Sequence, residues 1–236
     1  GASRGMGLAM ARQLLTPGRI LLCISRRTND ELAALAQAQG AHLEQWSQDL
    51  ADSQEAADRL ERWLGSLHAA ELDSATLINN AGVIPTISPL GGIATNDLSN
   101  ALHVGLESPL ALTSAFLRVT GRWVQHGWSG PRKVLNISSG LGRRAMASQA
   151  AYCTAKAGMD MYSQCVALEE AQQPNGARVV SLAPGVIDTD MQVQLRAGDP
   201  AAFPDLGNFI GMKERGQLTS PDAAAARVLA YLERPD

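Results

Sequence analysis

The sequence has few of the features that mark secreted, metal-binding or membrane proteins. Its three cysteines, Cys23, Cys153 and Cys165, are odd in number and widely spaced, so we interpret them as buried free thiols in a reducing cytoplasm. The four histidines are scattered, without cysteine or acidic neighbours at ligand spacing, which argues against a metal site. No apolar run approaches the roughly 20 residues of a membrane helix, and no targeting signal is visible.

Charge is also sparse and nearly balanced. Charged residues make up 18% of the chain, and the formal net charge is −3. Nothing in this balance favours nucleic acid or an anionic membrane as a partner. The pair Arg143-Arg144 is isolated, and a solvated or pocket-edge position suits it better than a nucleic-acid patch. With 236 residues and 45% hydrophobic content, the chain suits a single domain spanning residues 1–236.

Apolar runs alternate with helical stretches along the chain, which is typical of a parallel α/β sheet. The predicted strands are Ile20–Ser25, His42–Trp46, Thr76–Asn79, Lys133–Ile137 and Val179–Ala183. The predicted helices are Met6–Leu15, Asn29–Gln39, Ser53–Leu67, Leu98–Val119, Tyr152–Glu170 and Pro221–Leu232. Ser220 is expected to cap the last of these. Residues 190–217 mix glycine, proline and long side chains without a clear period, so we expect a mobile lid there.

Tyr152 and Lys156 are four residues apart, which stacks a phenol and an ammonium on one face of a helix. A phenol titrates near 10, so it needs a neighbouring cation to lower its pKa for acid–base work at neutral pH. Ser139, thirteen residues upstream at a strand end, could hydrogen-bond the oxygen of a substrate. On its own, the Tyr-x-x-x-Lys pair could also be a chance feature of an exposed helix.

The first seven residues carry glycines at positions 1, 5 and 7, followed by a good helix sequence. Such a loop lets the backbone approach a pyrophosphate, and the helix N-terminus then offers free N–H groups. The spacing G-x-x-x-G-x-G differs from the commoner G-x-G-x-x-G dinucleotide pattern. A glycine loop without ligand-binding function is the alternative for this segment taken alone.

These features, together with Asn79-Asn80-Ala81-Gly82 and Pro184-Gly185, resemble the short-chain dehydrogenase/reductase family in order and distance across nearly the whole chain. Within that family the resemblance is to the sepiapterin reductase branch. It implies an α/β, doubly wound parallel-sheet Rossmann-type fold. It also implies one strand before Gly1 and another after the last helix, so we expect terminal strands to lie outside this sequence.

The resemblance implies an NADPH/NADP site. A carboxylate at the end of the second strand would favour NAD, whereas this chain has Arg26 and Arg27 there, with Arg4 in the glycine loop. We therefore expect the three guanidinium groups to gather around a 2′-phosphate, although they could be ordinary surface arginines. The expected cofactor-binding residues are Gly1, Ser3, Arg4, Gly5, Met6, Gly7, Arg26, Arg27, Asp49, Leu50, Asn80, Ala81, Gly82, Tyr152, Lys156, Pro184, Gly185, Ile187, Thr189, Met191 and Gln192. The Asn79–Gly82 segment should line this cleft, or else form a purely structural turn.

The implied activity is an NADPH-dependent carbonyl reductase, in which Tyr152 protonates the alkoxide and Lys156 lowers the phenol pKa. Ser139 would hold the substrate oxygen, and Gly185 is the third expected substrate contact. By resemblance, the substrate is a pterin side-chain ketone or an aromatic ketone or diketone. The family's pterin anchor is an acid in a C-terminal tail, which this sequence does not include. A homodimer, or a tetramer built from it, would form through helices 98–119 and 152–170.

Gly105 departs from the family pattern, which places an Asn there to stabilise a helix kink and complete the proton relay. This leaves a non-catalytic NADPH-binding regulator as the alternative function. Glycine keeps the backbone carbonyl and tolerates a kink, so we expect an active enzyme with a looser relay. On this reasoning Gly105→Asn should preserve or raise kcat and slightly raise the melting temperature.

Overall fold

The computed structural model describes residues 1–234, so the last two residues of the expected domain lie outside the described part. The strands are β1 (Ile20–Ser25), β2 (His42–Ser47), β3 (Ala75–Asn79), β4 (Arg132–Ile137) and β5 (Arg178–Leu182). The α-helices are α1 (Gly5–Leu14), α2 (Asp30–Gln39), α3 (Ser53–Ser66), α4 (Thr95–Leu102), α5 (Ser108–Gln125), α6 (Ala150–Glu170), α7 (Asp190–Arg196), α8 (Leu206–Glu214) and α9 (Pro221–Leu232). Short 3₁₀ turns occupy Ala69–Glu71, Leu90–Gly92 and Gly140–Gly142, and a π-helical turn occupies His103–Glu107.

All five predicted strands are confirmed, each to within one residue at either end. They pair in parallel as two sheets with strand orders β1–β2 and β3–β4–β5. Gly1 lies between the two sheets, because its amino group donates a hydrogen bond to the Ile24 carbonyl, while a Cβ at this position would lie 2.8 Å from the Ala81 Cα. The glycine loop therefore starts where the carboxyl ends of β1 and β3 face each other, the position that binds ligands in open α/β sheets.

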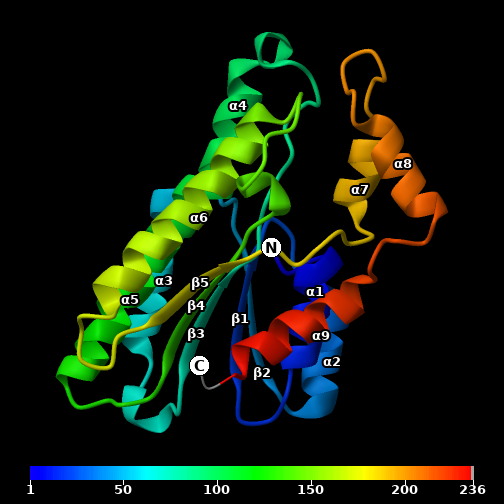
Figure 1. Cartoon of the computed structure of the whole chain (residues 1–236). Helices are drawn as coiled ribbons and strands as arrows, with labels where there is room; N and C mark the ends of the chain where they lie inside the picture. The colour runs from blue at the N-terminus through cyan, green and yellow to red at the C-terminus, as the bar shows by residue number, and fades with distance from the viewer. Residues whose placement is uncertain (235–236) are drawn as a thin grey trace.

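Helices cover both faces of the strands (Figure 1). On one face, α3 and α5 pack around a core that includes Leu60, Phe116 and Val134. On the other face, α1 and α9 pack around Met10 and Leu135, with α2 beside α1. The adjacent residues Val134 and Leu135 are both fully buried but point into opposite cores, as the period of a strand requires. This doubly wound arrangement confirms the expected fold class.

One predicted helix needed correction, and one segment without a predicted helix contains two. The expected helix over residues 98–119 is a longer helical stretch over 95–125, interrupted by the π-helical turn between α4 and α5. Residues 190–217 show no clear period in the sequence, yet α7 and α8 lie within them. Their role as a mobile lid stays a prediction. Helices of seven and nine residues are too short to show a clear hydrophobic period. The expected cap of α9 is present, since Ser220 Oγ accepts a hydrogen bond from Ala223 N at 3.2 Å.

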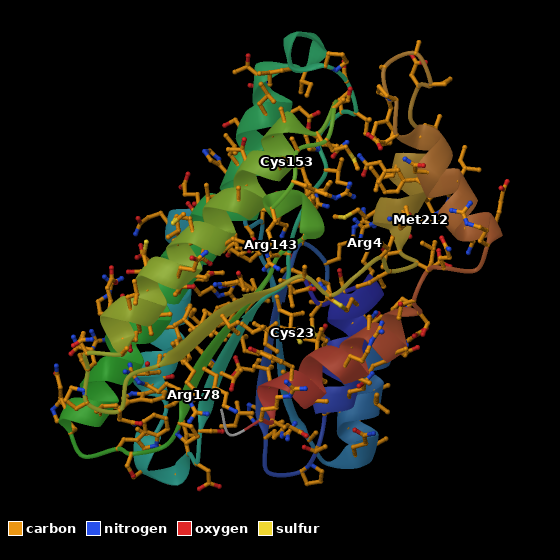
Figure 2. All side chains as sticks on the ribbon, viewed as in Figure 1. Arg4, Cys23, Arg143, Cys153, Arg178 and Met212 are labelled. Atoms are coloured by element: carbon orange, nitrogen blue, oxygen red, sulfur yellow. The ribbon has the colours of Figure 1, made fainter. Side chains whose placement is uncertain are left out.

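The three cysteines are free, but the expectation that all are buried is correct only for Cys23. Cys153, labelled on α6 in Figure 2, is partly buried. Cys165 lies on the same helix and is exposed. Within residues 1–234, no helix is long and apolar enough to cross a membrane. The same residues contain no group of three or more potential metal ligands.

Candidate active site

A cleft of about 1080 Å³ runs along the carboxyl ends of the strands, between the body of the molecule and helices α7 and α8. The structure brings every expected catalytic, cofactor and substrate residue to this one cleft. Asn79 is the exception among the motif residues. Its side chain is buried and donates to Asn136 Oδ1 at 2.8 Å and to Thr113 Oγ1 at 3.1 Å. Of the two adjacent asparagines, Asn79 therefore has a structural role, and Asn80 lines the cleft.

Lys156 is almost fully buried at the centre of the cleft, on the second turn of α6. Its ammonium donates to the Ile137 carbonyl at 2.7 Å and lies 5.9 Å from the centre of the Tyr152 ring. Burial lowers the pKa of Lys156 to about 8, and the Asp160 carboxylate one turn along the helix opposes this by favouring the charged form. The lysine is thus poised to change its charge near physiological pH.

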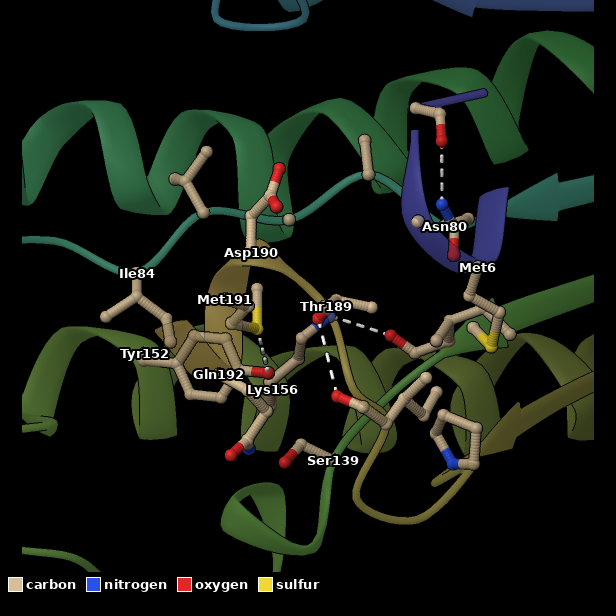
Figure 3. A pocket seen from close by; sticks show the side chains of 18 of the residues that line it. Met6, Asn80, Ile84, Ser139, Tyr152, Lys156, Thr189, Asp190, Met191 and Gln192 are labelled. Atoms are coloured by element: carbon tan, nitrogen blue, oxygen red, sulfur yellow. Dashed lines mark hydrogen bonds between the residues drawn. The ribbon is translucent and has the colours of Figure 1, made fainter. Parts of the chain in front are cut away.

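Tyr152 points into the same space as Ser139 and Met191 (Figure 3). Its hydroxyl is 4.0 Å from Met191 Sδ. Burial raises the pKa of the Tyr152 phenol, and a hydrogen bond with the Ser139 hydroxyl only partly opposes this. Lys156 is not among the groups that shift this pKa, so the expected lowering of the phenol pKa by Lys156 stays a prediction. A protonated phenol is the form that donates a proton, so this state suits carbonyl reduction.

The glycine loop has a steric reason for its spacing. A Cβ at Gly7 would lie 1.8 Å from the Gly1 carbonyl oxygen and 2.5 Å from Asn80 Nδ2. Asn80 Nδ2 donates to that same carbonyl at 2.9 Å, and Gly5 has a φ of +57°, a conformation that glycine adopts without strain. No described side chain caps the N-terminus of α1. Its N–H groups are therefore available to an anion such as a pyrophosphate.

The three arginines all line the cleft, but they differ in whether they already have a partner. Arg4 pairs with Asp190 of α7 at 2.8 Å across the cleft entrance. Arg26 and Arg27 are exposed at the cleft rim, and neither makes an ion pair within residues 1–234. Ser47 Oγ donates a hydrogen bond to the backbone carbonyl of Arg26 at 3.1 Å, and Ser25 Oγ donates one to that of Arg27 at 2.8 Å. Two guanidinium groups, not three, are thus free for a phosphate.

An apolar chamber at the α7–α8 end of the cleft was not predicted from the sequence. Its walls join residues from loops and helices that are far apart in the chain, which is why no local pattern identified them. They include Ile84, Leu141, Met146, Leu195, Phe209 and Met212. Tyr152 packs within the same cluster, so the proposed proton donor borders a space suited to an apolar substrate.

Gly105 lies in the π-helical turn and faces α6 at close range. A Cβ placed there would come within 3.0 Å of the Ala155 Cβ. Both atoms are held by helix backbones, so neither has a flexible side chain to move aside. The structure reverses the expectation for Gly105→Asn, because a larger side chain would push α6 away.

We expect Gly105→Asn to destabilise the fold by about 1–3 kcal/mol, the usual cost of overpacking. Thermal unfolding of wild type, Gly105→Ala and Gly105→Asn should give progressively lower melting temperatures. A melting temperature for Gly105→Asn at or above that of wild type would show that the two helices separate without cost.

Comparison with known proteins gives a consistent result. A family model described as short chain dehydrogenase matches residues 1–200. The chain is 36% identical over 233 residues to a benzil reductase ((S)-benzoin forming) of Bacillus cereus, covering 99% of this chain and 92% of that protein. It is 32% identical over 244 residues to sepiapterin reductase of Xenopus tropicalis, covering 99% and 89%. A short-chain dehydrogenase from Sphingobium yanoikuyae, solved in complex with NADPH, shares the fold with a TM-score of 0.76 at 24% identity, covering 99% of this chain and 82% of that one.

Proposed function

Because the chain belongs to the short-chain dehydrogenase family of oxidoreductases acting on CH–OH and C=O groups, we propose that it is an NADPH-dependent reductase of aromatic diketones. The observation that carries this proposal is the position of Tyr152, Ser139 and Lys156 at the border between the glycine-loop half of the cleft and the apolar chamber. The similarity to a benzil reductase supports an aromatic diketone as the substrate.

The residues of the cleft fit the chemistry of a dinucleotide. The uncapped N-terminus of α1 suits the pyrophosphate, and Arg26 and Arg27 suit a 2′-phosphate because no acid opposes them. Asp49 and Leu50 lie in the same half of the cleft, where we propose that they meet the adenine. When bound, NADPH supplies the hydride to the carbonyl carbon.

The protein's own residues handle the proton. Tyr152 Oη donates its proton to the carbonyl oxygen as the alkoxide develops. Ser139 Oγ holds that oxygen in place through a hydrogen bond. The Lys156 ammonium, 5.9 Å from the ring centre, stabilises the phenolate that remains. The apolar chamber excludes water and so strengthens these electrostatic interactions.

A pterin side-chain ketone is the second candidate substrate. The similarity to sepiapterin reductase supports it, and so does Asp205, an acid that lines the cleft beside α8. A carboxylate there could accept hydrogen bonds from the amino groups of a pterin.

The direct test is NADPH oxidation, followed by absorbance, against benzil, sepiapterin and simple aldehydes. Benzil reduction with the highest kcat/KM would support the leading proposal, and preference for sepiapterin would favour the second. Absence of turnover with every carbonyl, despite NADPH binding, would favour the non-catalytic regulator instead.

We expect cofactor use to depend on pH, because burial lowers the pKa of Lys156. Its pKa in the free protein is about 8, below the ordinary lysine value, so the ammonium loses its proton as pH rises through 8. We expect kcat/KM for NADPH, which reports the free enzyme, to be flat below pH 8 and to fall toward about tenfold per pH unit above it. Asp160→Asn removes the carboxylate that favours the charged lysine, so the fall should begin at lower pH. A profile unaffected by this substitution would contradict the assignment.

We also propose that the protein forms a homodimer, or a tetramer built from it, through α5 and α6. Leu110 on α5 and Met161 and Leu168 on α6 are 40%, 61% and 73% exposed, which is unusual for large apolar side chains. Light scattering at micromolar concentration should give at least twice the monomer mass. Leu168→Lys should shift the mass toward the monomer if this surface is the interface.

A cytoplasmic location is proposed from the free thiols, and cell fractionation tests it.

A further inference from the structure

Gln149 is a buried polar side chain without an internal partner. It is 1% exposed, and within residues 1–234 neither its Nε2 nor its Oε1 makes a hydrogen bond. Most buried amides are paired, because an unpaired amide loses its hydrogen bonds to water without replacement. Gln149 also lines the catalytic cleft. The missing partner is therefore expected to come from a bound molecule.

The position of Gln149 is fixed by the start of α6. It is the residue before the first turn, and its carbonyl accepts a hydrogen bond from Cys153 N at 2.8 Å. The preceding residue, Ser148, has a φ of +61°, an unfavourable region for a non-glycine residue. The Ser148 hydroxyl donates to the Ala202 carbonyl, which ties this turn to the segment between α7 and α8.

Gln149 belongs to the substrate half of the cleft. It is the N-cap residue of α6, three residues before Tyr152, and both residues line the cleft. Lys156 lies on the other side of Tyr152 along the helix, towards Gly82, the expected cofactor side. The cleft around the start of α6 also includes Leu141 and Met146, which are apolar. The Gln149 amide is thus a polar group set beside the proposed proton donor.

We propose that Gln149 recognises the second oxygen of a vicinal dicarbonyl substrate, an inference that rests on the proposed function and deepens it. Tyr152 and Ser139 hold the carbonyl that is reduced, and Gln149 Nε2 donates a hydrogen bond to the neighbouring carbonyl oxygen, which is retained in the hydroxyketone product. A monoketone leaves this amide unpaired in the complex. A site built in this way selects against substrates that lack the second oxygen.

The test compares benzil with deoxybenzoin, which has the same two phenyl rings but a methylene in place of one carbonyl. Gln149→Met keeps an unbranched side chain of similar size but has no hydrogen-bond donor, and Gln149→Leu is a second variant of the same kind. We expect kcat/KM for benzil to fall about 10-fold or more in both variants, and that for deoxybenzoin to change less than about 2-fold. Gln164→Met is the matched control on the same helix, since Gln164 lies outside the cleft.

An equal loss of kcat/KM with both ketones, or no loss with benzil, would overturn the proposal. The Gln149 amide would then have only a structural role or no role in substrate binding. Wild-type turnover tests the proposed function separately. If wild type reduces neither ketone, calorimetry of benzil binding to the NADP⁺-loaded protein decides the inference. A roughly 10-fold weaker affinity in Gln149→Met would support it, and unchanged affinity would overturn it.

Discussion

Tyr152→Phe is expected to lower kcat for a diketone by about 100-fold or more, because it removes the proton donor while keeping the ring. The ring packs with Ile84, Leu195 and Phe209, and the hydroxyl has only a 4.0 Å contact with Met191 Sδ and a hydrogen bond with Ser139. The fold and the cofactor half of the cleft should therefore survive. The measurements are steady-state kcat, the melting temperature and NADPH affinity by fluorescence.

Tyr162→Phe is the matched control for this experiment, since Tyr162 is a buried tyrosine on the same helix that does not line the cleft. It should retain turnover. Lys156→Ala should impair both turnover and NADPH affinity, because the Lys156 ammonium lies near the Tyr152 ring and also near Gly82 on the expected cofactor side of the cleft. Near-normal turnover in Tyr152→Phe would rule out the proposed mechanism.

The second large effect concerns cofactor choice. Wild type is expected to prefer NADPH over NADH in kcat/KM by at least tenfold, because Arg26 and Arg27 stand free at the cleft rim. Arg26→Ala or Arg27→Ala should remove one charge-assisted contact with the 2′-phosphate, worth about 1.5–3 kcal/mol, or roughly 10- to 150-fold. The kcat/KM for NADH should stay nearly constant, since NADH lacks this phosphate.

Arg62→Ala serves as the control, because Arg62 is an exposed arginine on α3 away from the cleft. Arg4→Ala should have a smaller effect on the preference than either rim arginine, because Arg4 already pairs with Asp190 at 2.8 Å. Equal use of NADPH and NADH by wild type would contradict the assignment. So would an Arg26→Ala,Arg27→Ala double variant with unchanged preference.

The sequence by itself determined the order of the strands and of the helices other than α7 and α8, because buried parallel strands read as short apolar runs between helical periods. It also predicted the catalytic and cofactor-binding residues that meet in the cleft, but not the walls of the apolar chamber or Gln149. The glycine loop, Asn80, Ser139 and the Tyr152/Lys156 pair all follow strand ends or begin helices, and the carboxyl ends of parallel strands meet at one edge. Each of these signals is local in the sequence, and the parallel sheet brings the residues together because its strands all end at the same edge.

Only the tertiary structure decided what each side chain faces. Asn79 turns into the core, Arg4 binds Asp190, and Gly105 permits close approach to Ala155. Burial, which no local pattern reveals, raises the pKa of Tyr152 and lowers that of Lys156. The missing hydrogen-bond partner of the Gln149 amide is also a feature that only the folded structure reveals. A contact or a pKa depends on residues that are distant in the chain, so it exists only once those residues are packed together.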